Sequence, residues 1–304
     1  MNDLHIYFCD FWKDFNKKSN IFVSALSENF QVFIDEHVSS NTDLIIYSCF
    51  GKEYLRYPFN KKLYYSGEND YPNFNECDYA LSHVVINGFD RYMRLPLWVS
   101  YEHESKDKFV ENPNYDDSYF DRKFCGTVVS NKFFAWPLRD KVMYKISEYK
   151  LVDNGGKLYN NVGGPVDDKL KFLNDYKFSI ASENSDVEGY VTEKIYEAFK
   201  ANTIPIYLGT NYVVNDFNKD AFINVNDFSS FTDLLFRIKE IDENKDLYME
   251  ILNHSRSIQN NTYNDFYNRL VEFMKHIIDG KKFNHLYGKM GIKWKSAVDL
   301  AYNK

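Results

Sequence analysis

The sequence lacks the segments that place a chain in or across a membrane. No stretch of it approaches the ~20 consecutive apolar residues of a membrane-spanning helix. Its first residues, MNDLHIYFCDFWKDFNKK, do not contain the basic region and following apolar region of a secretory signal peptide. We therefore expect a cytoplasmic protein.

Cysteine is scarce, and its spacing excludes two kinds of site. The four cysteines are scattered along the chain and form no C-x-x-C pair; they are Cys9, Cys49, Cys77 and Cys125. Such spacing disfavours a zinc site and a disulfide framework. It indicates reduced thiols that are buried in strands, as expected in a reducing compartment.

Two further absences narrow the functional class. The chain has no Gly-x-Gly-x-x-Gly motif, which disfavours a dinucleotide-dependent oxidoreductase. Its formal net charge is −7 and its pI is about 5.6, so it lacks the overall basic character of a nucleic-acid-binding protein. We expect no nucleic-acid partner.

The chain is long enough for two domains, each with its own core. It has 304 residues, of which 44% are hydrophobic and 18% aromatic. Two domains of about 150 residues would each bury a substantial core. Most aromatic rings are expected in those cores, and a minority could stack on sugars.

The first half alternates strand-like and helical segments. We expect a helix near 21–30 and strands at 4–9, 31–34, 44–50, 62–66, 79–83 and 92–99. This alternation predicts a Rossmann-like α/β domain. The segment 100–119 is rich in charge, Asn and Pro and has no periodicity, so we interpret it as the interdomain linker. The predicted domains are 1–118 and 119–280, followed by a tail at 281–304.

A turn in the first half presents a carboxylate at the end of a predicted strand. Ser66 and Gly67 form this turn, which would project Glu68 and Asn69 from the strand end. A carboxylate at such an edge suits a general base, although an ordinary surface glutamate is the alternative. Three other acids nearby are weaker candidates: Asp70, Glu76 and Asp78.

Cations occupy the first turns of two predicted helices in the second half. Pro137 suits the first position of one helix, and Arg139 follows in its first turn. Thr192, Glu193 and Lys194 begin another helix. A cation opposes the helix dipole there unless an anion binds as well, so both positions indicate a phosphate site. The alternative is that these are solvated surface residues.

The second of these helices belongs to the most informative stretch, 176–209. Alternating apolar residues at Tyr176, Phe178 and Ile180 predict a strand, and a polar loop follows at 182–189. Helix-spaced apolar residues then lead to a second strand at 204–208. A strand, loop, helix, strand unit implies parallel strands. Its loop therefore lies at the carboxyl edge of a sheet, where open α/β folds bind ligands.

The tail from Lys281 is basic. It has six lysines and one acid, Asp299, which gives a formal charge of +6 − 1 = +5. With aromatic and aliphatic residues interleaved, it could rest on the inner face of an anionic membrane. A helix that packs on the first domain is the alternative.

Several of these motifs together resemble a known family. One stretch contains ENS and, after a short gap, GYVTEKIYEAF and IPIYLG. This stretch is similar to the donor-binding motif of bacterial α1,3/4-fucosyltransferases, which form glycosyltransferase family 10. The stretch around SGEN resembles the GEN motif of the family, and RYMRLPLWV is similar to a later family segment. The resemblance implies an α/β fold of the GT-B type, with two Rossmann-like domains facing across a cleft.

The resemblance also implies roles for individual residues. Glu68 would be the catalytic base, and Arg139 and Lys194 would bind the donor diphosphate. Glu193 would bind the ribose, and Asn184 and Tyr190 would contact the diphosphate or the sugar. Weaker candidates for the acceptor site are Asn69, Arg91 and Arg94, and a structural salt bridge is the alternative for both arginines.

The implied reaction is an inverting transfer of L-fucose from GDP-β-L-fucose to N-acetyllactosamine or a related glycan of lipopolysaccharide or capsule. No Asp-x-Asp motif is present, so the resemblance implies chemistry without a metal, with Mg²⁺ or Mn²⁺ only assisting product release. Two alternatives stay open: another GDP-sugar or acceptor, and a non-catalytic protein that binds glycans or nucleotides. The sequence makes no prediction of oligomeric state.

Overall fold

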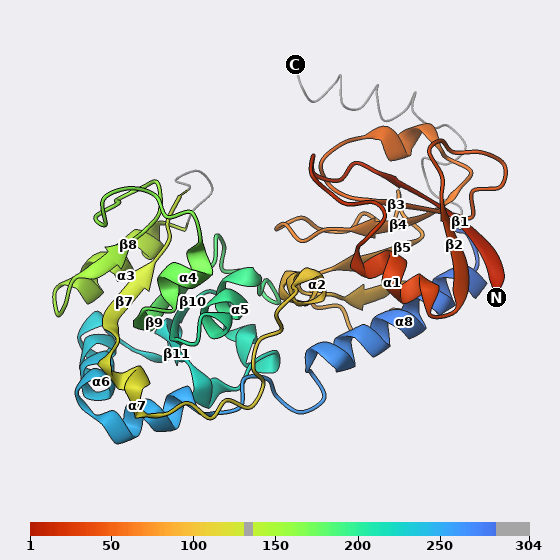
Figure 1. Cartoon of the computed structure of the whole chain (residues 1–304). Coiled ribbons are helices and arrows are strands. Elements are labelled where there is room, and N and C mark those ends of the chain that lie inside the picture. The colour runs from red at the N-terminus through yellow and green to blue at the C-terminus, as the bar shows by residue number, and fades with distance from the viewer. Residues whose placement is uncertain (131–135, 284–304) are drawn as a thin grey trace, which may run out of the picture. The chain divides into compact units, whose positions relative to one another are not determined.

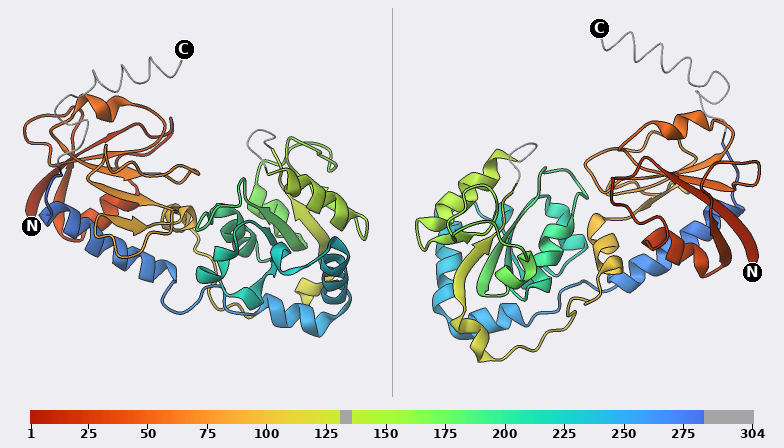
Figure 2. Two further views of the ribbon diagram at one scale, coloured as in Figure 1. Left: turned by 180° about the vertical axis from the view of Figure 1, so that it is seen from behind. Right: turned by 45° about the horizontal axis from the view of Figure 1, so that its top comes forward.

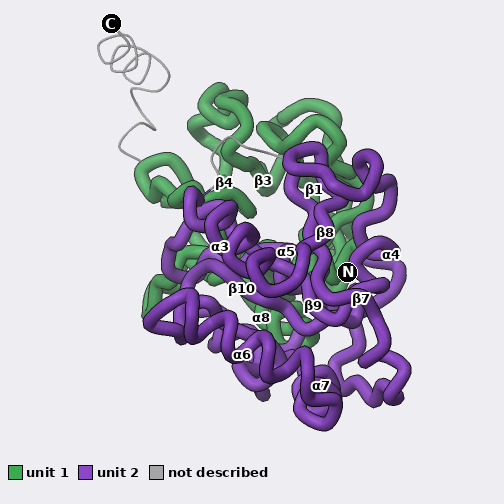
Figure 3. Tube along the Cα trace, turned by 90° about the vertical axis from the view of Figure 1, so that its left-hand side faces the viewer, with its two compact units in different colours: residues 1–104, 263–304 green, residues 105–262 purple. Residues whose placement is uncertain are grey.

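The structure, a computed structural model, describes residues 1–130 and 136–283. The chain forms two compact units, which Figure 3 distinguishes by colour. The first unit contains Met1–Glu104 and the chain from Tyr263 onward, and the second contains Ser105–Thr262. No helix among the described residues is long and apolar enough to cross a membrane.

The first unit is built on a six-stranded parallel sheet of order β2-β1-β3-β4-β5-β6. Its strands are β1 (Asn2–Cys9), β2 (Phe30–Ile34), β3 (Leu44–Tyr47), β4 (Lys61–Tyr65), β5 (Tyr79–Ser82) and β6 (Tyr92–Arg94). Its helices are α1 (Ile21–Ser27), α2 (Leu97–Glu104) and α8 (Tyr263–Asp279). The strands are short, mostly buried apolar runs, which is typical of a parallel sheet covered on both faces.

The second unit has a five-stranded parallel sheet of order β11-β10-β9-β7-β8. Its strands are β7 (Lys123–Thr127), β8 (Val152–Asn154), β9 (Tyr176–Ser182), β10 (Ile204–Leu208) and β11 (Ile223–Asn224). Its helices are α3 (Pro137–Ser147), α4 (Lys169–Leu173), α5 (Glu193–Lys200), α6 (Phe231–Glu243) and α7 (Lys245–Leu252). Short 3₁₀ turns lie at Glu53–Arg56, Asp117–Asp121, Asn211–Asn215, Lys219–Ala221 and Val225–Asp227.

The predicted unit at 176–209 is confirmed. β9 and β10 pair in parallel from Phe178 opposite Ile204 to Ser182 opposite Leu208, and α5 packs on both strands (Figure 1). The apolar side chains of β10 join those of α3 and α6 in one buried cluster, which fixes these helices on the sheet. Two Rossmann-like units therefore confirm the predicted α/β class.

Two predicted segments differ from the structure. The sequence predicts one strand over residues 92–99, but β6 ends at Arg94 and α2 begins at Leu97. Part of the expected linker, 100–104, belongs to that helix. Pro96 separates the two elements because its fixed φ and missing N–H interrupt the strand while suiting the start of a helix.

The larger difference concerns α8, which the sequence places within the second domain, 119–280. The helix belongs to the first unit, where it packs against α1 and α2, and Figures 1 and 2 show it alongside α1. Four residues at helical spacing form its buried stripe: Phe266, Leu270, Met274 and Ile277. Such spacing is typical of a helix with one buried face, but it does not specify which of two cores receives the stripe.

The carboxyl end of α8 is fixed to the first sheet by a lysine. Lys61 Nζ donates to the carbonyl oxygens of Ile277, Ile278 and Gly280, at 2.8, 2.9 and 2.7 Å. A cation at this end satisfies carbonyls that have no partner within the helix and interacts favourably with its dipole.

The tail predicted from Lys281 begins on the same unit. Phe283 N donates to Asp78 Oδ1 at 2.6 Å, and Lys282 Nζ donates to the carbonyl oxygen of Pro58 at 3.2 Å. Residues 284–304, which carry most of the predicted basic tail, lie outside the described residues.

Candidate functional site

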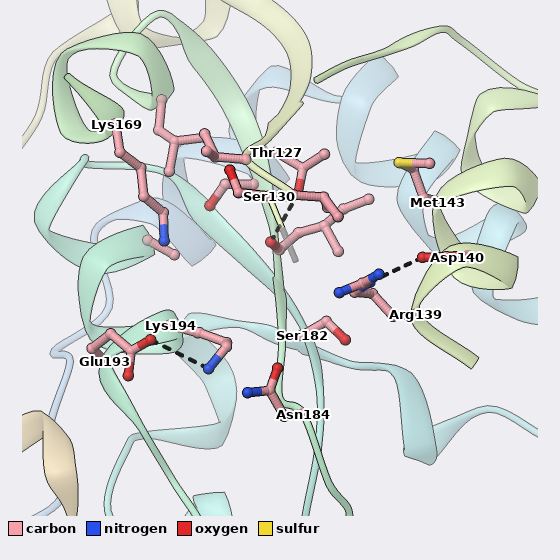
Figure 4. A pocket seen from close by; sticks show the side chains of 16 residues that line it. Thr127, Ser130, Arg139, Asp140, Met143, Lys169, Ser182, Asn184, Glu193 and Lys194 are labelled. Atoms are coloured by element: carbon pink, nitrogen blue, oxygen red, sulfur yellow. Dashed lines mark hydrogen bonds and ion pairs between the residues drawn. The ribbon is translucent and has the colours of Figure 1, made fainter. Parts of the chain in front are cut away.

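A cavity of about 270 Å³ lies at the carboxyl edge of the second sheet. The chain runs from β7 outward to β8, then returns to β9 on the other side of β7, so the strand order reverses between β7 and β9. Open α/β sheets bind ligands at such a reversal. Four residues predicted from the sequence line this cavity, as Figure 4 shows: Arg139, Asn184, Glu193 and Lys194.

The amino end of α5 forms one wall of the cavity and is organised by a buried carboxylate. Glu183 is 0% exposed, and its Oε1 accepts from Thr192 N at 2.8 Å. Its Oε2 accepts from Thr192 Oγ1 at 2.6 Å and from Lys194 Nζ at 3.3 Å. Both oxygens accept hydrogen bonds in these contacts, and burial raises the pKa of Glu183 above its ordinary value.

Lys194 is held rather than solvated, so the surface alternative for this residue is wrong. Its Nζ also donates to Thr192 Oγ1 at 3.0 Å and pairs with Glu193 Oε1 at 3.3 Å. Burial alone would lower the pKa of Lys194, but the Glu183 and Glu193 carboxylates outweigh it and raise that pKa. The ammonium is therefore charged at neutral pH, and the protein itself supplies the anions that the sequence led us to expect from a ligand.

Arg139 contributes a second cation from the opposite wall. It lies in the first turn of α3, is only 9% exposed and lines the cavity, so it is not the exposed helix-surface arginine of the alternative prediction. Its Nε donates to Asp140 Oδ1 at 2.9 Å, and Figure 4 shows the pair beside Ser182 and Asn184. Both cations thus follow strands that end at the same sheet edge.

The two remaining residues of the predicted donor site differ in position. Asn184 is exposed and lines the cavity two residues after the end of β9. Tyr190 is 3% exposed and is not among the lining residues; its backbone N–H donates to the carbonyl oxygen of Val187 at 2.9 Å. The structure thus brings four of the five predicted donor-site residues to one cavity and places the side chain of Tyr190 in the core.

In the first unit, Glu68 follows β4 as predicted and is exposed. Ser66 Oγ fixes the turn, because it accepts from Glu68 N at 3.1 Å and donates to the Glu68 carbonyl oxygen at 3.2 Å. Asn69 is exposed beside it. The turn chemistry of Ser66 therefore presents the Glu68 carboxylate to solvent.

The rival acids are engaged within the first unit. Asp70 accepts from Tyr64 Oη at 2.6 Å, and the buried Glu76 accepts from Tyr54 Oη. Asp78 is 0% exposed and accepts from Lys62 N at 2.7 Å. These contacts favour Glu68 over its rivals as the group available to a substrate.

Comparison with known proteins places the chain in a family. Residues 6–101 match the model of the Alpha-(1,3)-fucosyltransferase FucT N-terminal domain. Residues 121–281, more than half of the chain, match the model of the Glycosyltransferase family 10 (fucosyltransferase) C-terminal part. The chain belongs to glycosyltransferase family 10.

Individual relatives agree with this placement. The Helicobacter pylori Alpha-(1,3)-fucosyltransferase FucT is 28% identical in an alignment 306 residues long, gaps included, that covers 88% of this chain and 64% of that relative. The chain thus spans just under two thirds of the length of this relative.

Two solved structures extend the comparison to the fold. A crystal structure of an α1,3-fucosyltransferase matches 93% of this chain and 92% of its own, with 26% identity and a TM-score of 0.79. A crystal structure of an α1,3-fucosyltransferase with GDP-fucose matches 94% and 93%, with 26% identity and a TM-score of 0.77. This member of family 10 therefore has the predicted GT-B type of fold.

The prediction for Arg91 in this family 10 chain is not supported by its contacts. Its Nε donates to the carbonyl oxygen of Asp78 at 2.6 Å, and Nη2 donates to that of Cys77 at 2.8 Å. The guanidinium also lies over the rings of Phe74, Phe89 and Phe283. Arg91 has a structural role, but backbone carbonyls and aromatic faces replace the salt bridge of the alternative prediction.

Arg94 has a backbone partner as well. Its Nε donates to the carbonyl oxygen of His83 at 3.2 Å. Burial, followed by the charge of Arg94, lowers the pKa of His83 to about 4, so this imidazole is neutral at physiological pH. An acceptor-binding role for Arg94 stays a prediction.

Sequence reasoning missed residues that shape the family 10 cavity. Lys169, the first residue of α4, lines it and pairs with Glu197 of α5. Ser182 lines it from the end of β9. The segment before α4 offered no signal for Lys169, whereas Glu183 stands inside the quoted ENS motif and could have been chosen for its place directly after a strand.

Among the described residues, no group of three or more His, Cys, Asp or Glu side chains is arranged to hold a metal ion. The four cysteines are free thiols; Cys49 is half-buried and the others are buried. Metal-independent chemistry stays a prediction.

Proposed function

We propose that this family 10 protein transfers L-fucose from GDP-β-L-fucose to a hydroxyl of a GlcNAc-containing glycan, with α1,3 linkage and inversion at the anomeric carbon. The observation that carries the proposal is the convergence of Arg139, Asn184, Glu193 and Lys194 on one cavity at the strand-order reversal. The crystal structure of a similar α1,3-fucosyltransferase with GDP-fucose supports the choice of donor.

In the proposed donor complex, the cavity receives the nucleoside diphosphate. The Arg139 guanidinium can bind two phosphate oxygens with its planar fork. Lys194 and the amino end of α5 contribute further positive potential, although Glu183 and Glu193 share the charge of Lys194. Glu193 is in turn available to accept hydrogen bonds from ribose hydroxyls.

The proposed chemical step is a single displacement. The acceptor oxygen forms a bond to the anomeric carbon while the bond from that carbon to the β-phosphate oxygen breaks. GDP leaves with the electron pair, and Glu68 takes the proton of the acceptor hydroxyl. Because attack comes from the face opposite the leaving group, β-L-fucose becomes an α-L-fucoside.

Metal ions have no part in the proposed step, because Arg139, Lys194 and the α5 amino end stabilise the leaving diphosphate. Mg²⁺ or Mn²⁺ would only assist product release. For the acceptor we propose N-acetyllactosamine, which would give a Lewis-x type product in lipopolysaccharide or capsule. We also propose a cytoplasmic location, with the basic tail contacting the membrane.

A transfer assay tests this function. Purified protein is given GDP-fucose and a panel of acceptors that includes N-acetyllactosamine, with EDTA present, and GDP release is read with and without acceptor. We expect acceptor-dependent release and an α1,3-linked product by NMR. Release that requires added Mg²⁺ would contradict the metal-independent step. GDP binding without release would favour a different donor or acceptor, or a protein that only binds nucleotide.

Alanine variants test the phosphate site. Arg139→Ala and Lys194→Ala should each weaken GDP binding by about 1.5–3 kcal/mol, the scale of a hydrogen bond to a charged group, or roughly 10- to 150-fold in Kd. Titration calorimetry with GDP measures this. Lys157→Ala is a control, because this lysine is exposed and does not line the cavity. Equal GDP affinity in all three variants would exclude the assigned phosphate contacts.

A further inference from the structure

A tyrosine outside the predicted motifs is connected to Arg139 through one carboxylate. Tyr159 Oη donates to Asp140 Oδ2 at 3.0 Å, while Arg139 Nε donates to Asp140 Oδ1 at 2.9 Å. The two oxygens of Asp140 are therefore engaged by different partners. A carboxylate with hydrogen bonds at both oxygens cannot rotate freely. The Asp140 carboxylate therefore fixes the orientation of the Arg139 guanidinium, its partner at the cavity.

The loop that carries Tyr159, between β8 and α4, is itself built for a defined geometry. Leu158 N donates to the carbonyl oxygen of Val129 at 2.9 Å, and Asn154 Nδ2 donates to that of Leu158 at 2.9 Å. On the other side, Asn160 Nδ2 donates to the carbonyl oxygen of Gly156 at 2.9 Å. Hydrogen bonds thus connect the neighbours of Tyr159 to the end of β8 and to the segment that follows β7.

Tyr159 has a backbone conformation that few residues other than glycine adopt. Its φ is +53°, in the left-handed region. Such a conformation persists only where surrounding contacts determine it, and it occurs preferentially at functional sites. Here the hydrogen bonds of Leu158 and Asn160 supply those contacts and direct the side chain toward Asp140.

The chemistry of the pair suits a permanent hydrogen bond. The hydrogen bond to Asp140 raises the pKa of Tyr159, so the phenol stays protonated and continues to donate. The ring is half-exposed, at 41%, and contacts the Tyr144 ring edge-on with 5.9 Å between centroids. Core packing therefore does not account for its placement.

We propose that Tyr159 is a positioning residue that acts through Asp140 to orient the Arg139 guanidinium toward the donor diphosphate. The inference rests on the proposed function, because it takes Arg139 to bind that diphosphate. Arg139 and Asp140 both line the cavity, whereas Tyr159 is not among the residues that line it. Tyr159 would thus affect phosphate recognition without touching the ligand.

A double-mutant cycle tests this. The Kd values of GDP and of guanosine are measured by calorimetry for the wild type, Tyr159→Phe, Arg139→Ala and the double variant. Tyr159→Phe should raise the Kd of GDP about three- to tenfold, the effect expected from one lost hydrogen bond, and leave that of guanosine unchanged. In the Arg139→Ala background, the same change should have no further effect on GDP.

Matched variants complete the test. Tyr144→Phe removes a phenol from the neighbouring ring on α3 and should bind GDP as the wild type does. Asp140→Asn keeps the size of the side chain but removes its charge. It should weaken GDP binding at least as much as Tyr159→Phe does. Unchanged guanosine affinity in these variants shows that the cavity is intact.

Three results would overturn the inference. If Tyr159→Phe binds GDP with wild-type affinity while Arg139→Ala binds it more weakly, Tyr159 has no positioning role, and the proposed phosphate site is unaffected. An equal loss with and without Arg139 would show that Tyr159 acts by another route. Unchanged GDP affinity in Arg139→Ala would instead reject the proposed role of Arg139, and the inference with it.

Discussion

Replacing Glu68 by glutamine is expected to lower kcat by about 10²- to 10⁴-fold, the range for loss of a general base. The carboxylate is exposed after β4, and Ser66 holds its turn through the Glu68 backbone. Glutamine keeps that backbone geometry but cannot accept the acceptor proton. Because the cavity residues belong to the second unit, the Kd of GDP should not change.

The measurement is the initial rate of GDP release at saturating donor and acceptor. Asp70→Asn is the matched control, since Asp70 lies two residues after Glu68 and its carboxylate accepts from Tyr64 Oη. Wild-type turnover in Glu68→Gln would show that Glu68 is not the base. A large loss of turnover in Asp70→Asn alone would indicate that Asp70 is the base instead.

Replacing Glu183 by glutamine is expected to lower the free energy of unfolding by about 3–5 kcal/mol, the cost of breaking a buried ion pair by removing one partner. Three donors converge on the two carboxylate oxygens: Thr192 N, Thr192 Oγ1 and Lys194 Nζ. A glutamine has one acceptor oxygen, so its NH₂ group must face at least one of these donors.

Chemical denaturation with and without GDP measures both consequences. We also expect GDP affinity to fall by tenfold or more, on the scale of one charged hydrogen bond, because Lys194 loses one of its two carboxylate partners. Glu188→Gln is the control: it changes an exposed acid in the same loop and should leave stability and affinity unchanged. Wild-type stability in Glu183→Gln would show that the buried carboxylate does not organise the α5 amino end.

The sequence predicts the donor cavity better than its surroundings, for a physical reason. Arg139 and Lys194 each occupy the first turn of a helix that follows a parallel strand, and such turns meet at one sheet edge. Local spacing therefore suffices to bring them together. The burial of Tyr190 was not predictable in this way, because a loop residue adjoining a helix can face either the ligand or the core.

Long-range contacts account for the other differences. Arg91 binds carbonyl oxygens of Asp78 and Cys77, and no residue pattern marks a backbone carbonyl as a partner. Lys169 reaches the cavity through its pairing with Glu197, 28 residues later. The apolar stripe of α8 can be identified in the sequence by its helical spacing. The core against which this stripe packs depends on which of the two sheets has an uncovered face.

The return of α8 makes the first unit discontinuous along the chain, and this decides which fragments can be produced. Residues 105–262 form the second unit as one uninterrupted stretch, so a gene fragment could encode it whole. A fragment ending at Glu104 would lack α8, the helix that packs against α1 and α2 and carries a buried apolar stripe. A usable fragment of the first unit would instead need α8 joined to residue 104 by a linker in place of the second unit.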